Sequence, residues 1–289
     1  DRRSAPQPAP EPTSRQNTDT PASIRRVVTL TPSATELVVA IAGPSTVIGY
    51  DRYSDRLKLG ITPKPTVVGD FLSPSFEAIA RLRPELVVAD ALQDKVVQGL
   101  EAAKISTLAL PMHTVDDVWR AAAAIGDATG QRERADEVVK AGRAALARVR
   151  QRGQQRGRRA GVLVVIDRAP DDLSGMVAAG PGSYVDELLA IIGADNVLAS
   201  SKVRYPRIAA EQIRRAAPDV IIDASADSAK HQAAWKRLSD VGAVARGRVV
   251  PTADRRLTSP SVQVESVIPE LERMVYGPSS DDSATGQGD

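Results

Sequence analysis

The residue types that most often carry chemistry are scarce in this chain of 289 residues. Cysteine is absent, which excludes disulfides, thiolate metal sites and cysteine nucleophiles. Histidine occurs only as His113 and His231. Neither has a ligand-like neighbour in sequence, so we expect surface or capping residues rather than metal ligands. Ser183 has no nearby histidine base, and no Gly-x-Ser-x-Gly elbow exists. We therefore expect no catalytic residue, no metal site and no enzymatic activity.

Two glutamates differ from the other carboxylates because they occupy matching positions of a repeated segment. Residues 76–90 (FEAIARLRPELVVAD) align with residues 210–224 (AEQIRRAAPDVIIDA), which places Glu77 on Glu211, 134 residues further along. Each copy predicts a short helix that ends at a proline and is followed by a buried parallel strand. Each glutamate then lies in the first turn of its helix, where the helix dipole favours a carboxylate.

A second, weaker repeat has the same order along the chain. Residues 36–43 (ELVVAIAG) resemble residues 187–194 (ELLAIIGA). Two such matches on either side of one long helical segment indicate two related lobes. A cleft between two lobes is a common place for a small ligand to bind.

Short apolar runs alternate with helical patterns between the two ends of the chain, which is typical of βαβ units and parallel sheets. The predicted strands cover residues 27–30, 47–49, 66–68, 86–89, 107–110, 162–166, 220–223 and 249–250. The predicted helices cover residues 35–42, 76–82, 95–103, 115–128, 184–192, 211–216 and 262–275.

One helical segment is longer than the others. Residues 132–152 contain no helix breaker except Gly142, and their apolar residues form a stripe with a period near 3.6. A helix of ~20 residues spans ~30 Å, about the width of a small domain. The fold class we predict is therefore α/β, with two Rossmann-like lobes of parallel sheet joined by one long backbone α-helix.

This fold implies five segments. We predict a disordered tether (1–23), an N-terminal lobe (24–130), the connecting helix (131–153), a C-terminal lobe (154–276) and a disordered tail (277–289).

The overall charge and composition exclude several classes of partner. The formal net charge is only +2, and aromatic residues make up 3% of the chain, so we expect no nucleic-acid binding. The arginine-rich run at residues 148–159 is expected to be the solvated end of the connecting helix. The longest apolar stretch, residues 37–42, is far shorter than the ~20 residues that span a bilayer.

Four motifs resemble those of a known family, both in their order along the chain and in their spacing. They are residues 25–37, 67–77 with 83–88, 178–188 and 205–211. They resemble the helical-backbone (class III) periplasmic binding proteins for vitamin B12, ferric siderophores and haem. The resemblance covers residues 24–276.

The resemblance implies an extracytoplasmic solute-binding protein that captures a corrinoid or a ferric siderophore and docks on the permease dimer of an ABC importer. It implies a location in the periplasm or on the outer face of the cell membrane, with a lipid anchor as one option. We expect a monomer. In this family one glutamate of each lobe meets permease arginines, and the matching residues are Glu77 and Glu211.

The resemblance also implies which side chains contact the ligand. The spacing of Ser33 and Glu36 fits a capping box, so Thr31–Thr35 is expected to be a loop that enters a helix and lines the cleft. The implied ligand contacts are Ser33, Ala34, Thr35, Tyr50, Tyr53, Phe71, Tyr205, Asp254 and Arg256.

Three alternatives stay open at this point. A haem receptor of the same fold is disfavoured because Thr31-Pro32-Ser33 replaces a Gly-Gly-Thr-type loop. A two-lobed Rossmann-like enzyme acting on a nucleotide-type substrate should show Gly-x-Gly-x-x-Gly after its first strand, and this chain does not. A scavenging protein with no transporter is the third alternative.

Overall fold

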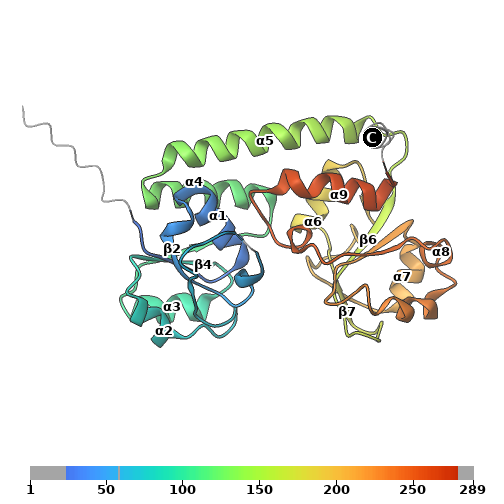
Figure 1. Ribbon diagram of the computed structural model, residues 1–289. Coiled ribbons are helices and arrows are strands. Elements are labelled where there is room, and N and C mark those ends of the chain that lie inside the picture. Colours follow the sequence, from blue (N-terminus) through green and yellow to red (C-terminus); the bar gives the residue numbers. More distant parts are fainter. Residues whose placement is uncertain (1–23, 58, 279–289) are drawn as a thin grey trace, which may run out of the picture.

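The computed structural model describes residues 24–57 and 59–278. Two α/β lobes lie side by side beneath one long helix (Figure 1). The predicted tether, residues 1–23, lies outside the described residues, as does the predicted tail from residue 279 onward.

The first lobe is built on a parallel sheet. Among the described residues it has five strands in the order β3-β2-β1-β4-β5, and every pairing is parallel. Its strands are β1 (Val27–Thr29), β2 (Val47–Tyr50), β3 (Thr66–Val67), β4 (Leu86–Asp90) and β5 (Thr107–Leu110). Its helices are α1 (Pro32–Ala42), α2 (Phe76–Leu82), α3 (Asp94–Ala102), α4 (Val115–Thr129) and the short 3₁₀ turns η1 (Pro44–Thr46) and η2 (Ser54–Leu57).

The second lobe has a mixed sheet, which corrects the prediction of parallel sheets in both lobes. Its order is β11-β10-β6-β7-β9, with β8 also paired to β6. The pairs β6–β7 and β7–β9 are antiparallel. Only residues 168–175 connect β6 to β7, which is too short for the crossover that a parallel pair requires.

The second lobe surrounds its mixed sheet with helices and 3₁₀ turns. Its strands are β6 (Gly161–Asp167), β7 (Met176–Ala178), β8 (Asp195–Asn196), β9 (Arg207–Ile208), β10 (Val220–Asp223) and β11 (Val249–Pro251). Its helices are α6 (Tyr184–Ile191), α7 (Ala210–Ala216), α8 (Gly242–Ala245), α9 (Val264–Tyr276) and the 3₁₀ turns η3 (Gln232–Leu238) and η4 (Arg255–Leu257).

Helix α5 (Arg132–Gln154) runs along the tops of both lobes and contacts α1, α4, α6 and α9 (Figure 1). Gly142, the expected weak point of this helix, lies against the ring of Trp119, and a Cβ atom there would overlap the indole. Gly153 makes a similarly close approach to the backbone of Gly193. Both glycines therefore serve close packing rather than flexibility.

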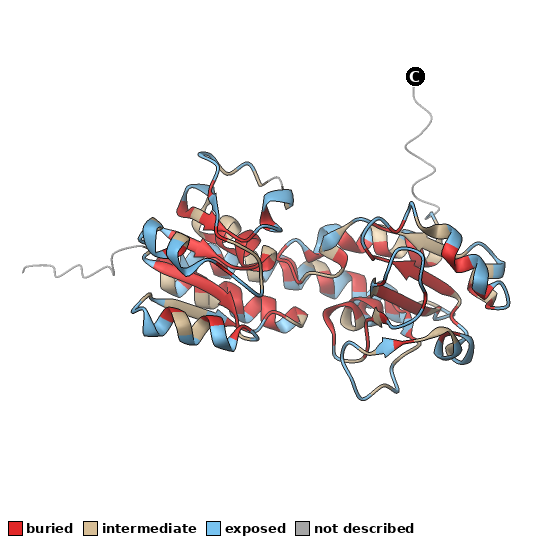
Figure 2. Ribbon diagram, turned by 90° about the horizontal axis from the view of Figure 1, so that it is seen from below, coloured by how far each residue is buried: buried red, intermediate tan, exposed pale blue. Residues whose placement is uncertain are grey.

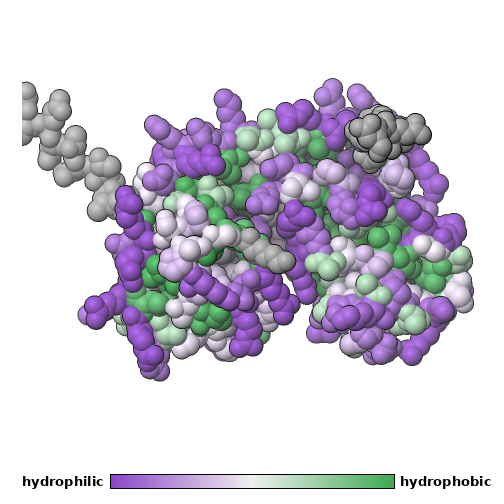
Figure 3. Space-filling view, viewed as in Figure 1, coloured by the Kyte–Doolittle hydropathy of each residue, from purple (hydrophilic) through white to green (hydrophobic). Residues whose placement is uncertain are grey.

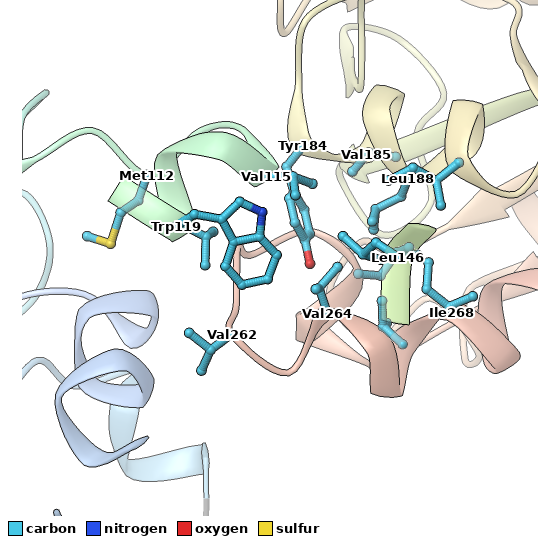
Figure 4. Packing of buried hydrophobic residues seen from close by; sticks show 14 of the residues in the cluster. Met112, Val115, Trp119, Leu146, Tyr184, Val185, Leu188, Val262, Val264 and Ile268 are labelled. Carbon is cyan, nitrogen blue, oxygen red and sulfur yellow. The ribbon is translucent and has the colours of Figure 1, made fainter. Parts of the chain in front are cut away.

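One hydrophobic core continues from one lobe into the other. The central strands of both sheets are buried, while the surrounding helices expose one side (Figure 2). Trp119 and Val115 of α4 belong to the same buried cluster as Tyr184 of α6 and Ile268 of α9 (Figure 4). Because this core crosses the junction, rotation of one lobe against the other would expose apolar surface. That exposure costs about 25 cal/mol of free energy per Å².

The repeat seen in the sequence is also present in the structure. Helices α2 and α7, and the starts of β4 and β10, are offset by the same 134 residues. Each short helix ends in a left-handed residue, Arg83 at φ 48° and Ala217 at φ 45°, directly before a proline. The proline disfavours the helical region for the residue before it, so both helices stop at the same place.

Candidate functional site

A cavity of about 750 Å³ lies between the lobes, and Figure 3 shows the notch that separates them on one face. The cavity is lined by Pro32, Glu36, Tyr53, Arg56, Leu57 and Leu59 from the first lobe, and by residues 224–227, 253–256, Thr258, Ser259 and Gln263 from the second. Most of these residues follow the carboxyl ends of β2, β10 and β11. This is the edge at which α/β sheets usually bind ligands.

The wall from the first lobe is the turn that follows β2. The buried Asp51 carboxylate accepts hydrogen bonds from the Tyr53 amide, at 2.8 Å, and from the Ser54 hydroxyl. Burial raises the pKa of Asp51. With its backbone fixed in this way, Tyr53 holds its ring in the cavity wall with 48% of the residue exposed.

The wall from the second lobe is the loop Ala224–Asp227, which is held from behind by a buried ion pair. Arg168 and Asp223 are 2.7 Å apart, and both side chains have 0% exposure. Asp223 also accepts hydrogen bonds from Trp235 Nε1 at 2.9 Å and from the Ser225 hydroxyl at 2.6 Å. The loop therefore begins at a carboxylate whose position is fixed from several directions.

The floor of the cavity joins the lobes through polar contacts. Ser261 donates a hydrogen bond from its hydroxyl to the buried carboxylate of Glu36 in α1. Burial raises the pKa of Glu36, although the Ser261 hydrogen bond acts in the opposite direction. The hydroxyls of Ser33 and Ser259 make a second contact between the lobes, at 3.0 Å.

The charged side chains of the described residues that line the cavity balance in number, with Glu36, Asp227 and Asp254 against Arg56, Arg255 and Arg256. Asp254 is paired with Arg256 at 2.6 Å, and Asp227 with Lys230 at 2.9 Å. Arg56 and Arg255 have no ion-pair partner among residues 24–57 and 59–278. Arg56 comes from the opposite lobe yet contributes, after Lys230, to lowering the pKa of Asp227. An acidic group on a ligand would therefore find unpaired guanidinium groups here.

The predicted loop Thr31–Thr35 is helical instead. Helix α1 begins at Pro32, and its N-cap is Thr31, whose hydroxyl accepts a hydrogen bond from the Ala34 amide at 3.2 Å. The assignment of Ser33 to a capping box was wrong because proline fits the first helical position so well. Ala34 and Thr35 are fully buried, so neither can touch a ligand in this arrangement.

The predicted aromatic contacts are divided between three environments. Tyr53 lines the cavity. Tyr50 is buried, donates a hydrogen bond to Asp55 at 2.7 Å, and has its pKa raised to about 12 by burial and by that carboxylate. Phe71 and Tyr205 are partly exposed and are not among the residues that line the cavity. Burial raises the pKa of Tyr205, with a smaller contribution from Asp90.

The predicted docking glutamates lie on the surface. The side chain of Glu77 is 82% exposed and pairs with Arg81 at 2.6 Å. The side chain of Glu211 is 76% exposed, with Arg214 at 3.9 Å. Asp254 and Arg256, the two predicted polar contacts, both line the cavity.

We expected surface or capping histidines, and His231 does occupy the N-cap position of η3, whereas His113 is largely buried. The side chain of His113 is only 15% exposed, and its Nε2 lies 3.4 Å from the Asp90 carboxylate. His231 lies 3.3 Å from Asp171. The neighbour of His113 comes from the adjacent strand, so it could not be read from nearby sequence. In the part of the chain that the structure describes, no three histidine, cysteine or acidic side chains are grouped as a metal site.

Several cavity residues were missed by the sequence analysis, most clearly Glu36, Arg56, Arg255 and the loop Ala224–Asp227. The position of these loops in the sequence could have identified them. Each follows the carboxyl end of a predicted strand, or the turn after it, where α/β folds usually bind ligands.

No helix among the described residues has the length and hydropathy needed to cross a membrane.

Comparison with known proteins gives a consistent result. Residues 27–255 match the family described as "Periplasmic binding protein". An uncharacterized ABC transporter substrate-binding lipoprotein, YvrC of Bacillus subtilis (strain 168), is 26% identical over 87% of this chain and 80% of its own length. The vitamin B12-binding protein of Salmonella typhi is 27% identical over 68% of this chain and 71% of its own length.

A solved structure is similar over nearly the whole described chain. The periplasmic heme-binding protein from Pseudomonas aeruginosa has a TM-score of 0.78 at 22% identity, and the match covers 89% of this chain and 94% of that one. At this identity the likeness shows the fold alone.

Proposed function

The chain belongs to the periplasmic binding protein family, and from this premise we propose that it is the extracytoplasmic substrate-binding protein of an ABC importer. Its cargo is a corrinoid or a ferric siderophore, bound in the cavity between the lobes. The observation that carries the proposal is the 750 Å³ cavity, formed by loops of both lobes. This volume lies in the range of pockets that bury small ligands.

A haem receptor is the second candidate. The observation that favours it is that two arginines in the cavity wall, Arg56 and Arg255, have no ion-pair partner among the described residues. Haem carries two propionate groups that such guanidinium groups would bind, whereas cyanocobalamin offers them only its single phosphodiester anion. An anionic ferric siderophore would satisfy the same arginines.

We propose that Glu77 and Glu211 dock on arginines of the permease. They lie in the first turns of helices α2 and α7, which are on the side of the molecule away from α5 (Figure 1). Both carboxylates are exposed and have an arginine one helical turn further along. A permease arginine could therefore replace a weak surface ion pair at little cost.

The remaining assignments follow from this role. We propose that residues 24–130 and 154–276 act as two lobes around the helix at 131–153. The protein acts as a monomer outside the cytoplasm and catalyses no reaction. A lipid anchor is supported by the Bacillus subtilis relative, which is named a lipoprotein.

A panel of ligands tests the cargo. Purified protein is mixed with cyanocobalamin, haemin and ferric siderophores of catecholate, hydroxamate and citrate type, and thermal unfolding is followed. A ligand at 100 times its Kd adds about 2.7 kcal/mol to the stability of the folded state, which is a clear rise in Tm. A rise with one class names the cargo. No rise with any of them, and a rise with a nucleotide, would overturn the proposal.

A cavity variant locates the binding. Tyr53→Ala removes an exposed ring from the cavity wall and should weaken binding of the active panel ligand roughly tenfold, as expected for a large aromatic contact. Val67→Ala is the matched control, because Val67 is similarly exposed but does not line the cavity. Equal affinities of the two variants would place the ligand elsewhere.

A further inference from the structure

The positive charge of the chain is concentrated in one stretch. Residues 138–160 contain eight lysines and arginines and no acidic residue, although the whole chain carries only +2. We use the name basic surface for the lysine and arginine side chains of this stretch together with Arg246 and Arg248.

The fold gathers these side chains on the outside of the molecule. The buried residues of α5 include Gly142, Leu146 and Val149, which face the core, so Lys140, Arg148 and the other basic residues of the helix are exposed. Beyond the helix, Arg158 meets Arg246 and Arg248 around a second cavity of about 610 Å³. Arg246 and Arg248 thus continue the surface that begins on α5, although they lie almost one hundred positions further along the chain.

Acidic neighbours neutralise only part of this charge. Arg158 and Arg246 share Asp219, and Arg152 and Arg156 share Glu272. Arg159 pairs with Asp195, and Arg143 lies 3.6 Å from Asp116. Three other members, Lys140, Arg148 and Arg150, have no ion pair with any residue that the structure describes. The excess charge therefore lies along the helix and at the mouth of the second cavity.

The part of the basic surface that lies on α5 and the proposed docking carboxylates are on opposite sides of the molecule. Helix α5 is at the top of Figure 1, whereas α2 and α7 lie towards the bottom. If Glu77 and Glu211 meet the permease, a step that rests on the proposed function, this part of the basic surface faces away from the membrane that holds it.

We propose that the basic surface binds a linear, phosphate-bearing polyanion outside the cell. Residues 140–152 extend over roughly 18 Å of helix at 1.5 Å per residue, a length that suits repeated charges better than a single small anion. The large exposed apolar side chains of the described residues are all in other parts of the chain, which disfavours insertion into lipid. No aromatic side chain is free there for stacking, because Arg156 covers the ring of Tyr276, which disfavours nucleic acid.

Binding of linear polyphosphate to the full chain, measured over a series of salt concentrations, tests the proposal. The triple variant Arg148→Gln, Arg150→Gln, Arg158→Gln should bind at least roughly tenfold more weakly at low salt, and its slope of log K against log salt should be shallower by about 2. These side chains are exposed and lie outside the core, so the variant should fold.

The matched control removes the same charge elsewhere. Arg25→Gln, Arg52→Gln and Arg215→Gln alter exposed arginines outside the basic surface, and affinity should stay within about threefold. Equal losses in both triple variants would reduce the effect to net charge and overturn the proposal. So would tighter binding to vesicles with 30 mol% phosphatidylglycerol than to polyphosphate, or equal competition by inorganic phosphate. None of these outcomes depends on the cargo in the cleft.

Discussion

The two lobes share the elements that hold the exposed glutamates and differ in those that form the cleft. Helices α2 and α7 carry Glu77 and Glu211 in their first turns, and each ends in a left-handed residue directly before a proline. Beyond them the lobes diverge. The position that matches Asp223 of β10 is Ala89 of β4, so only the second lobe has an anchoring carboxylate there. A partner that binds both lobes in the same way would require the shared helices, whereas an asymmetric ligand would require walls that differ between the lobes.

The second repeat joins the lobes instead of facing outward. Glu36 of α1 and Glu187 of α6 occupy its first position. Glu36 accepts a hydrogen bond from Ser261 of the second lobe, and Glu187 accepts one from the Val115 amide of the first at 2.7 Å. Each lobe thus places one carboxylate against the other lobe, buried at Glu36 and half-buried at Glu187, and burial raises the pKa of both.

The largest effect on stability should come from the anchor that only the second lobe has. Asp223→Ala leaves the Arg168 guanidinium buried without its partner, and we expect a loss of about 3–5 kcal/mol in the free energy of unfolding. Asp240→Ala is the matched control, because it breaks an exposed pair with Arg214 and should cost at most about 1 kcal/mol. Urea unfolding measures both, and equal losses would show that the Asp223 pair is no anchor.

A smaller loss should follow from filling the junction between α4 and α5. Gly142→Val forces methyl groups against the Trp119 ring and should cost about 1–3 kcal/mol through overpacking. Ala144→Val places the same side chain on the exposed side of α5 and should cost well under about 1 kcal/mol. If both variants unfold at the same urea concentration, the glycine does not serve packing.

The smallest effect should be a change in pH dependence. The raised pKa of Glu36 means that the folded protein holds this proton more tightly than the unfolded chain does. The resulting stabilisation is complete below the ordinary carboxyl pKa and is lost as pH rises through the raised value. The glutamine of the Glu36→Gln variant cannot ionise. The free energy of unfolding of this variant should therefore rise relative to that of the wild type as pH rises.

Thermal unfolding between about pH 4 and 8, the range in which such a carboxyl titrates, would show this gain. Glu133→Gln, at the exposed start of α5, should follow the wild-type curve. If Glu36→Gln also runs parallel to the wild type, ionisation of Glu36 does not affect the contact between the lobes.

Sequence patterns predicted the elements that depend on local signals. The helix at residues 76–82 and the strands at 107–110 and 220–223 have the predicted bounds. Pro84 stops the helix, Pro111 follows the first strand, and the second strand is a buried run rich in β-branched residues. The strands β7, β8 and β9 were missed since each is only two or three residues long and depends on pairing with distant residues.

The site was less predictable than the fold. Tyr53, Asp254 and Arg256 line the cavity, and their contact with a ligand stays a prediction. Ala34 and Thr35 are buried because a helical turn begins three residues earlier than expected. The Arg168–Asp223 pair joins residues 55 positions apart, and no local pattern indicates such a contact.

The account is tested most directly by comparing affinity and cellular uptake for the same pair of substitutions. Glu77→Ala with Glu211→Ala changes two exposed side chains outside the cavity. We predict that this double variant binds the active panel ligand with unchanged Kd but no longer supports its uptake by cells that depend on this protein. Wild-type uptake by the double variant would contradict docking through these carboxylates and favour a scavenging protein without a transporter.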